Sequence, residues 1–232
     1  MPAPATKVIA LDGPSGSGKS TVARGVAQAL RWRYVDTGAT YRAATLAVLR
    51  AGSELTDQAT IASVVETADI DVSTDPGTAG VRLDGEDVTA VVRGPEVTAA
   101  VSAVSAVPAV RTRLVALQRR LAGESGAVLE GRDIGTAVFP DAAVKVFLDA
   151  SAEVRAARRA GDDDAGVSVP GGQTAVAAVA ADLARRDRLD SSRTTSPLQA
   201  ASDAVHLDSS TLDAAQVVER VLDLARSAGL TP

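Results

Sequence analysis

The 232-residue sequence has no cysteine, two phenylalanines, two tyrosines, one tryptophan and one histidine. Without cysteine, the chain has neither disulfide bonds nor thiolate metal sites. Aromatic residues make up 2% of it, so the core is built mainly from Ala, Val, Leu and Ile. Trp32 alone makes no stacking platform for bases, and we interpret it as packing. His206 lies in an apolar run, where we expect a strand or core residue rather than a catalyst.

Long apolar runs are also missing, and none approaches the length of a membrane span. The first residues lack the basic-then-apolar pattern of a secretion signal. The net charge of −5 argues against a general affinity for nucleic acid or anionic membranes. We therefore expect a cytoplasmic protein without nucleic-acid or membrane partners.

The stretch Gly13–Ser20, GPSGSGKS, matches the phosphate-binding loop pattern G-x-x-x-x-G-K-[ST]. Its glycines let backbone N–H groups turn inward around a polyphosphate, where Cβ atoms would obstruct them. Lys19 is placed to reach the β- and γ-phosphates, and the Ser20 hydroxyl to ligate Mg²⁺. The predicted nucleotide-binding residues are Gly13, Pro14, Ser15, Gly16, Ser17, Gly18, Lys19, Ser20 and Thr21.

Apolar runs alternate with helical patterns along most of the chain, which predicts a parallel sheet with crossover helices. The expected core strands are Lys7–Leu11, Arg33–Val35, Ala127–Glu130, Val144–Leu148 and Ala204–Leu207. The expected helices are Lys19–Leu30, Thr40–Ala51, Asp57–Thr67, Glu96–Val107, Pro108–Ala122, Ala152–Arg159, Thr174–Asp187 and Asp213–Ser227. The phosphate loop therefore lies between the first strand and a helix whose N-terminal dipole favours anions.

Two segments interrupt this alternation. Asp69–Val92 alternates with period two and carries Pro-Gly and Asp-Gly turn signals, so we predict a small antiparallel unit inserted into the core fold. Gly161–Gly172 is polar and glycine-rich between two arginine-bearing helices. This second segment is either an ordinary surface loop or a mobile lid over the phosphates.

Polar residues follow the second predicted strand, at the sheet edge where ligands of open α/β sheets bind. Asp36 and Thr37 serve either the site or the capping of the next helix. Arg42 lies one turn into that helix, where its guanidinium would bind a second phosphate group through two parallel hydrogen bonds.

The third predicted strand ends in the same way, with Glu130, Arg132 and Asp133. A structural ion pair of Arg132 with Asp133 or Glu130 is one explanation, and polar recognition of a substrate is the one we favour. Glu130 is our candidate for the outer shell of Mg²⁺. Asp149 also resembles a magnesium-holding aspartate at a strand end, but we favour Asp149 or Ser151 as the cap of the following helix.

Arginines cluster on both sides of the predicted lid. Arg155, Arg158 and Arg159 share one helix face, and the others follow the lid. The second group is Arg185, Arg186, Arg188 and Arg193. Such a cluster is either a solvated basic face or a set of cations for the oxygens of a transferred phosphoryl group. The nearby phosphate loop favours the second interpretation.

Together these motifs resemble the bacterial cytidylate kinases, members of the nucleoside monophosphate kinases. The matching stretches are Leu11–Ser20, Asp36–Arg42, Gly131–Asp141, and Arg186 with Asp190–Arg193 and Ser196–Leu198. The resemblance covers nearly the whole chain. It implies one α/β domain over residues 1–232, with a five-stranded parallel sheet flanked by helices. It also implies a monophosphate-binding lobe at 64–107 and a lid at 160–173.

The resemblance further implies transfer of the γ-phosphoryl group of ATP to CMP or dCMP with Mg²⁺, by a monomer. Ser102, Arg111 and Asp133 would read the cytosine ring. The other implied substrate residues are Asp36, Thr37, Tyr41, Arg42, Arg132, Arg186, Asp190 and Arg193. The implied catalytic residues are Lys19, Arg158, Arg159 and Arg193, and the implied metal residues are Ser20 and Glu130.

Three alternatives remain at this point. The acceptor is UMP or AMP rather than CMP, or the chain binds nucleotides without turning them over, or it is a slow nucleotide-dependent switch. A guanine-nucleotide switch needs an Asn-Lys-x-Asp motif, and the sequence has none. Such a switch would also leave a second set of phosphate-binding arginines unexplained.

Overall fold

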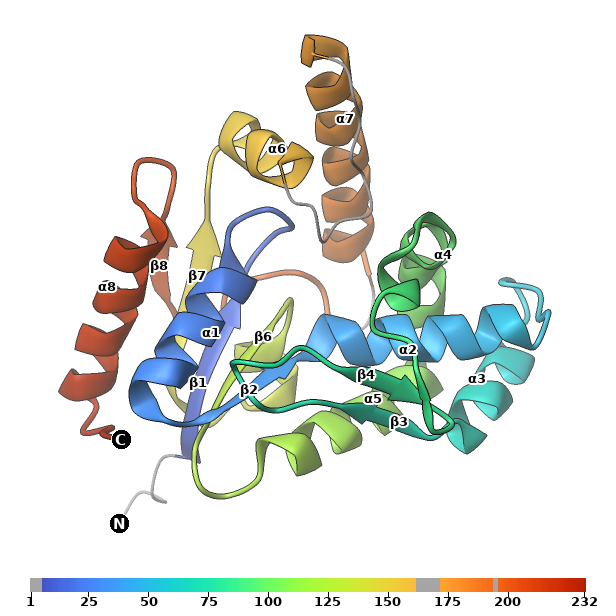
Figure 1. Ribbon diagram of the computed structural model, residues 1–232, viewed down its shortest axis with the longest axis horizontal. Coiled ribbons are helices and arrows are strands. Elements are labelled where there is room, and N and C mark those ends of the chain that lie inside the picture. The colour runs from blue at the N-terminus through green and yellow to red at the C-terminus, as the bar shows by residue number, and fades with distance from the viewer. Residues whose placement is uncertain (1–5, 162–171, 194–195) are drawn as a thin grey trace.

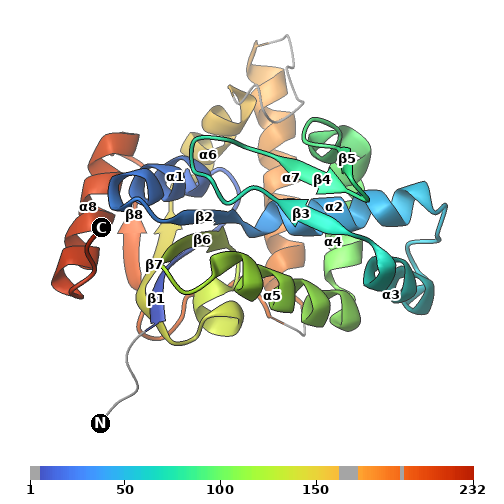
Figure 2. The same cartoon turned by 60° about the horizontal axis from the view of Figure 1, so that its bottom comes forward.

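The structure, a computed structural model, describes residues 6–161, 172–193 and 196–232, and only the backbone of 172–178. Its central sheet has five parallel strands in the order β2-β6-β1-β7-β8 (Figures 1 and 2). The strands are β1 (Thr6–Asp12), β2 (Arg33–Asp36), β6 (Ala127–Gly131), β7 (Ala142–Asp149) and β8 (Val205–Asp208). The predicted five-stranded parallel sheet is confirmed.

Both faces of the sheet are buried over its central strands, which explains why β1, β6 and β7 are largely apolar. Ile9 and Leu11 of β1 pack with helices α1 (Lys19–Leu30) and α8 (Ala214–Ser227). Val8 and Ala10, which alternate with them, pack toward helix α5 (Pro108–Ala122) on the other face. Figure 1 shows α1 and α8 side by side. The sheet is therefore a rigid platform between two helical layers.

A second core lies beside the sheet, where the inserted antiparallel unit packs against neighbouring helices, including α5. Its other helices are α2 (Thr37–Arg50), α3 (Gln58–Thr67) and α4 (Pro95–Ser105), with a short 3₁₀ turn, η1, at Val91–Arg93. Strands β3 (Ile70–Val72), β4 (Val81–Leu83) and β5 (Glu86–Asp87) form an antiparallel sheet in the order β3-β4-β5. The predicted antiparallel unit is confirmed. Its loop contacts the edge of the main sheet, where the Tyr34 N–H donates to the Thr74 carbonyl at 2.9 Å.

Two helices stand over the carboxyl ends of the strands, α6 (Ala152–Ala160) and α7 (Gly172–Ser191) (Figure 1). Most of the predicted lid, residues 162–171, falls between them and lies outside the described residues. Of the helices in the described part, none alone is long and apolar enough to cross a membrane. Only α4 and α5 together pass that test, as a pair bent by 103°.

Capping residues explain why helices begin at residues other than the predicted ones. Helix α2 begins at Thr37, three residues earlier than predicted, because the Asp36 carboxylate accepts a hydrogen bond from the Ala39 N–H at 2.9 Å. Asp149 or Ser151 was expected to cap the helix after β7, and the cap is Ser151, whose side chain accepts from the Val154 N–H. Asp36, for which capping was one of two alternatives, does cap α2. A π-helical turn, η2, at Ile134–Val138 was not predicted.

Candidate functional site

The phosphate loop leaves β1 at Asp12 and enters α1 at Lys19, as predicted. Gly13 touches the end of β7 so closely that a Cβ atom there would lie 2.0 Å from the Leu148 carbonyl oxygen. Gly16 has a φ of +80°, and a Cβ atom there would lie 2.8 Å from the Arg155 carbonyl oxygen. Glycine is therefore required at both positions, because the backbone itself packs against β7 and α6.

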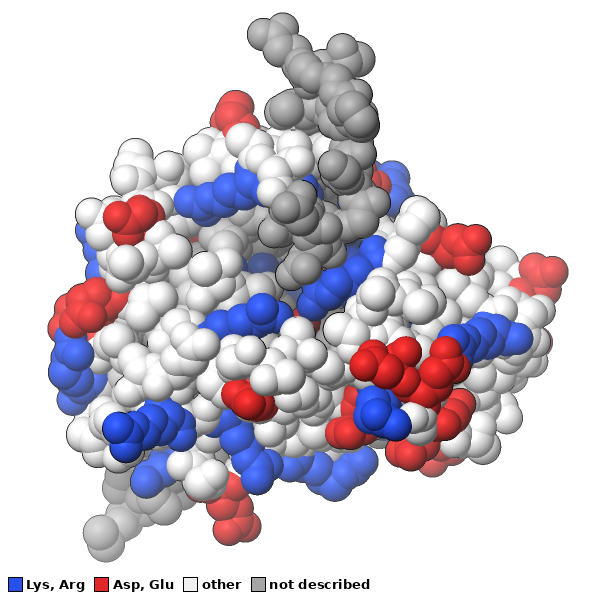
Figure 3. Space-filling model, in the orientation of Figure 1, with Lys and Arg blue, Asp and Glu red and all other residues white. Residues whose placement is uncertain are grey.

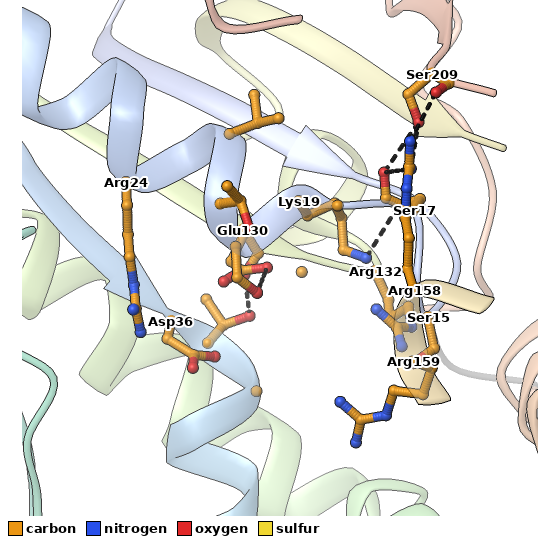
Figure 4. A pocket seen from close by; sticks show the side chains of 18 of the residues that line it. Ser15, Ser17, Lys19, Arg24, Asp36, Glu130, Arg132, Arg158, Arg159 and Ser209 are labelled. Atoms are coloured by element: carbon orange, nitrogen blue, oxygen red, sulfur yellow. Dashed lines mark hydrogen bonds between the residues drawn. The ribbon is translucent and has the colours of Figure 1, made fainter. Parts of the chain in front are cut away.

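Lys19 is buried at the centre of the loop. Its Nζ donates to the Pro14 carbonyl at 2.7 Å and lies 3.4 Å from the Ser17 hydroxyl (Figure 4). Burial, followed by the nearby Arg132 cation, lowers the pKa of Lys19 to about 7. A polyphosphate beside this amine would stabilise its charged form.

Glu130 lies at the carboxyl end of β6, facing the start of α1. The Ser20 hydroxyl donates to its Oε2 at 2.9 Å, and the Tyr34 hydroxyl donates to its Oε1. Burial, followed by the charge of Asp36, raises the pKa of Glu130 above its usual value. Ser20 and Glu130, the predicted metal residues, are thus in direct contact and offer the oxygen atoms that Mg²⁺ prefers.

Asp12 lies in the matching stretch Leu11–Ser20, where the sequence assigns it no role, and its contacts in the structure give it one. Its carboxylate accepts from the backbone N–H groups of Ile134 at 2.7 Å and Gly135 at 2.8 Å. Burial raises the pKa of Asp12 to about 6. The bonds fix η2 against the end of β1, and η2 follows directly after Arg132 and Asp133. Sequence alone had no signal for this pairing, since the partners are backbone groups 122 and 123 residues away.

Opposite the phosphate loop, Asp190 of α7 holds two of the predicted substrate arginines. Arg132 Nε donates to its Oδ2 at 3.0 Å, and Arg193 pairs with its Oδ1. Arg132 also donates from Nη1 to the Gly13 carbonyl at 3.1 Å. The alternative that Arg132 pairs with Asp133 or Glu130 is wrong, because its carboxylate partner is Asp190.

Arg42 contributes a further cation from α2. It donates to the Val92 carbonyl and the Thr98 hydroxyl, both at 3.0 Å. Burial, and then the positive charges of Arg186, Arg159 and Arg93, lower the pKa of Arg42 to about 10. Arginines repel one another at this density, and a bound anion would relieve that repulsion.

A buried ion pair forms the far end of this pocket. Arg111 of α5 pairs with Asp133, and their residues are 3% and 5% exposed. Arg111 Nη1 also donates to the Ser105 carbonyl at 3.3 Å, and its guanidinium lies 5.5 Å from the centre of the Tyr41 ring. Among the described residues, buried Arg111 Nε has no hydrogen-bond partner. An unsatisfied donor beside a fixed carboxylate favours a polar ligand here.

The arginines of α6 fall into two groups. Arg155 and Arg158 bind the backbone of the phosphate loop. Arg155 donates to the Ser15 carbonyl at 3.2 Å, and Arg158 donates to the Ser17 carbonyl at 3.3 Å. Arg158 also donates to the Ser209 hydroxyl and carbonyl, at 2.9 and 2.8 Å. Arg159 extends into the cleft beside them (Figure 4). Ser209, a residue that sequence analysis missed, thus joins the segment after β8 to α6 and the phosphate loop.

Most of these side chains line one cleft of about 1060 Å³, and Asp12 and Arg155 lie outside its lining. It brings together every predicted site residue except Gly13 and Pro14, which do not line it. Figure 3 shows Lys and Arg side chains gathered around the hollow in the middle of the face. The cleft also contains residues that were not predicted: Arg24, Gln28, Arg93, Ser105, Ser209 and the segment 212–218.

Two predicted residues at the start of α2 have mainly structural contacts. Asp36 caps α2, and its other oxygen pairs with Arg93 at 3.4 Å. The Thr37 hydroxyl donates to the Glu130 carbonyl at 2.6 Å. Both residues also line the cleft, so their contacts with β6 and η1 tie the two cores together at the site.

Asp149 and His206 lie outside the cleft. Asp149 is exposed and accepts from the Ala150 N–H, and His206 is an exposed residue of edge strand β8 whose ring contacts Phe147. The expectation that His206 is a strand residue is confirmed. Among the described residues, no three potential metal-ligating His, Asp or Glu side chains lie together.

The parallel sheet, the phosphate loop and the facing pocket of arginines define a P-loop phosphotransferase. Residues 9–227 match the model of the cytidylate kinase family. The chain is 53% identical to a cytidylate kinase of Mycolicibacterium paratuberculosis, covering 94% of this chain and 95% of that protein. It is 56% identical to one of Rhodococcus jostii, covering 93% of each. This chain belongs to the cytidylate kinase family.

Among solved structures, the fold is similar to a gluconokinase from Sinorhizobium meliloti, at 19% identity and a TM-score of 0.46. That match covers 97% of this chain and 94% of the other.

Proposed function

We propose that the chain transfers the γ-phosphoryl group of ATP to CMP or dCMP, giving ADP and CDP or dCDP. The observation that supports this proposal is that one cleft is lined by both the phosphate loop and a separate group of arginines, which we propose as two anion sites. The phosphate loop forms one of them. Arg42, Arg132, Arg186 and Arg193 form the other, beyond Lys19.

The phosphate loop would hold the donor. Its inward N–H groups and the N-terminus of α1 bind the β- and γ-phosphates, with Lys19 beside them. An oxygen of the acceptor phosphate forms a bond to the γ-phosphorus as the bond from that phosphorus to the β–γ bridging oxygen breaks. The acceptor phosphate is already ionised, so the transfer needs no general base.

Ser20 and Glu130 would hold Mg²⁺, since their oxygen atoms are already 2.9 Å apart at the start of α1. Bound there, the ion supplies positive charge to the β- and γ-phosphates.

Arg42, Arg132, Arg186 and Arg193 would bind the acceptor phosphate, with Asp190 holding Arg132 and Arg193 in place. Asp36, Thr37 and Tyr41 also line the cleft. Thr37, with Asp190 and Arg186, would lie near the sugar and phosphate of the acceptor.

The Asp133 carboxylate would accept a hydrogen bond from the exocyclic amino group of cytosine. Arg111 and Ser102 would contact the remaining polar edge of the ring. Uracil carries a carbonyl oxygen where cytosine has the amino group. That oxygen would face a carboxylate without a proton between them, so UMP should bind more weakly.

We further propose that the lobe at 64–107 closes over the acceptor and that a lid at 160–173 closes over the donor. Arg158, Arg159 and Arg193 would then neutralise charge on the transferred group, and closure would exclude water as a competing acceptor. A monomeric state and a cytoplasmic location stay predictions from the sequence.

The test is product analysis with ATP and each of CMP, dCMP, UMP and AMP. We expect CDP and dCDP as the main products, with much slower turnover of UMP and AMP. If UMP or AMP were turned over faster than CMP and dCMP, that nucleotide would be the acceptor and the proposal would be wrong. Nucleotide binding without any diphosphate product would instead indicate a binding module.

A further inference from the structure

Tyr34 lies next to the proposed metal site, although no sequence motif pointed to it. In the parallel pairing of β2 with β6, Tyr34 is opposite Val128 and Asp36 is opposite Glu130. Residues two apart on a strand share a face, so Tyr34 and Glu130 both face α1. Their side chains meet diagonally across the two strands, where the Tyr34 hydroxyl donates to Glu130 Oε1.

The two oxygens of Glu130 have different donors. Oε2 accepts from Ser20 at 2.9 Å, and Oε1 accepts from Tyr34. Glu130 and Tyr34 are 5% and 4% exposed, so water has little access to replace either bond. Ser20 is itself a proposed metal ligand. Of these two donors, the Tyr34 hydroxyl is therefore the one that is not also a proposed metal ligand.

The tyrosine ring is itself held in place. The Arg24 guanidinium lies 5.3 Å from its centre, and Arg24 is one helical turn after Ser20 on α1. Ser20 and Arg24 therefore share a face of α1, one over Glu130 and the other over Tyr34. The backbone N–H of Tyr34 donates to the Thr74 carbonyl at 2.9 Å, which anchors the strand from its open edge.

We infer that Tyr34 is a positioning residue that holds the Glu130 carboxylate in the orientation needed to bind Mg²⁺ with the donor nucleotide. The inference rests on the proposed function, because it refines the metal site of that reaction. Tyr34 acts only through Glu130. Removing its hydroxyl should therefore weaken the metal's contribution and leave metal-independent nucleotide binding unchanged.

The test compares wild type with Tyr34→Phe, which removes the hydroxyl and keeps the ring beneath Arg24. Isothermal titration calorimetry measures ADP affinity once in Mg²⁺ and once in EDTA. The ratio of the two affinities is the enhancement due to the metal. We expect Tyr34→Phe to reduce this ratio about 10-fold, the usual effect of losing an outer-shell partner. Its affinity in EDTA should stay within about twofold of wild type.

A double-mutant cycle with Glu130→Gln separates positioning from general packing. If Tyr34 acts through Glu130, adding Tyr34→Phe to Glu130→Gln changes the ratio no further. Trp32→Phe alters another buried aromatic residue two positions away and should leave the ratio unchanged. Thermal denaturation checks that each variant is folded.

Two results would overturn the inference. One is an unchanged ratio in Tyr34→Phe, including equal losses of affinity in Mg²⁺ and in EDTA, and the other is additive effects in the double mutant. The proposed function is tested separately by CDP formation in wild type. A protein that made no CDP but showed the expected ratios would refute the proposed acceptor and support the role of Tyr34.

Discussion

The two sides of the cleft are built by different means. On the donor side, backbone holds the site: Gly13 and Gly16 pack directly on β7 and α6, and Lys19 donates to a carbonyl of its own loop. On the acceptor side, side chains from α2, β6 and α7 hold it, and Asp190 orders Arg132 and Arg193. The donor side is thus a local motif in the sequence, and contacts of its backbone with β7 and α6 hold it in place. The acceptor side depends on distant segments meeting, and its substitution should change substrate choice more readily.

The largest expected effect is on the donor side, from Lys19→Met. The γ-phosphoryl group loses its fixed cation, so kcat/KM should fall about 10³-fold, as when a buried transition-state donor is removed. Steady-state kinetics with ATP and CMP would measure it. Lys7→Met removes an exposed lysine of the adjacent strand β1 and serves as the matched control. Near-normal turnover by Lys19→Met would refute the proposed donor site.

Asp133→Asn should impair the use of CMP more than the use of UMP. It removes a charged hydrogen-bond acceptor, so kcat/KM for CMP should fall about 100-fold. The new amide donates to a uracil carbonyl, so the preference for CMP over UMP should shrink. Competition between CMP and UMP would measure this. Because Asp133 is buried against Arg111, unfolding should be measured alongside. An unchanged preference in a folded variant would remove Asp133 from base recognition.

Asp190→Asn should loosen the acceptor arginines without affecting the donor. We expect the KM for CMP to rise about 10-fold, because Arg132 and Arg193 lose a charged partner, while the KM for ATP stays close to wild type. Asp182→Asn is the matched control. It too breaks a pair with an arginine three residues away, but that pair is on the exposed surface. Equal changes in both KM values would mean that Asp190 supports the whole cleft.

The smallest predicted effect is a proton taken up on the donor side. The pKa of Lys19 is lowered to about 7, so at pH 8 much of the free enzyme carries a neutral amine. A polyphosphate favours the ammonium form, so binding ATP raises this pKa and draws in a proton. Calorimetry in buffers of different ionisation enthalpy should show uptake of up to one proton at pH 8 and little at pH 6. Lys19→Met should show none, and uptake that persisted in that variant would assign the proton elsewhere.

The same contrast explains what the sequence could predict. The phosphate loop, its flanking strand and helix, and the five parallel strands follow from local patterns, and the structure has them where expected. The cap at Asp36 was an open alternative, and the structure shows that bond together with a place in the cleft. Local pattern was sufficient wherever the partners are near in sequence.

Contacts between residues far apart in the sequence could not be predicted from local sequence patterns. Tyr34 and Glu130 are 96 residues apart, and Arg132 and Asp190 are 58 apart. Strand order, register and the placement of α7 bring them together, and each depends on the packing of the whole core. Arg42, Arg132 and Asp133 were anticipated from their positions after predicted strands, whereas Ser102, Arg111 and Asp190 were anticipated only through resemblance to a family. Asp12 and Ser209 were missed because backbone atoms and distant loops supply most of their partners. Arg93 was missed because its partner, Asp36, is 57 residues away.

The most direct test of two substrates in one cleft is a time course of ADP and CDP formation by wild type. With ATP and CMP both present, we expect ADP and CDP to accumulate in equal amounts. With ATP alone, ADP should form far more slowly. ADP formation at the same rate without CMP, or in its presence without matching CDP, would contradict the account.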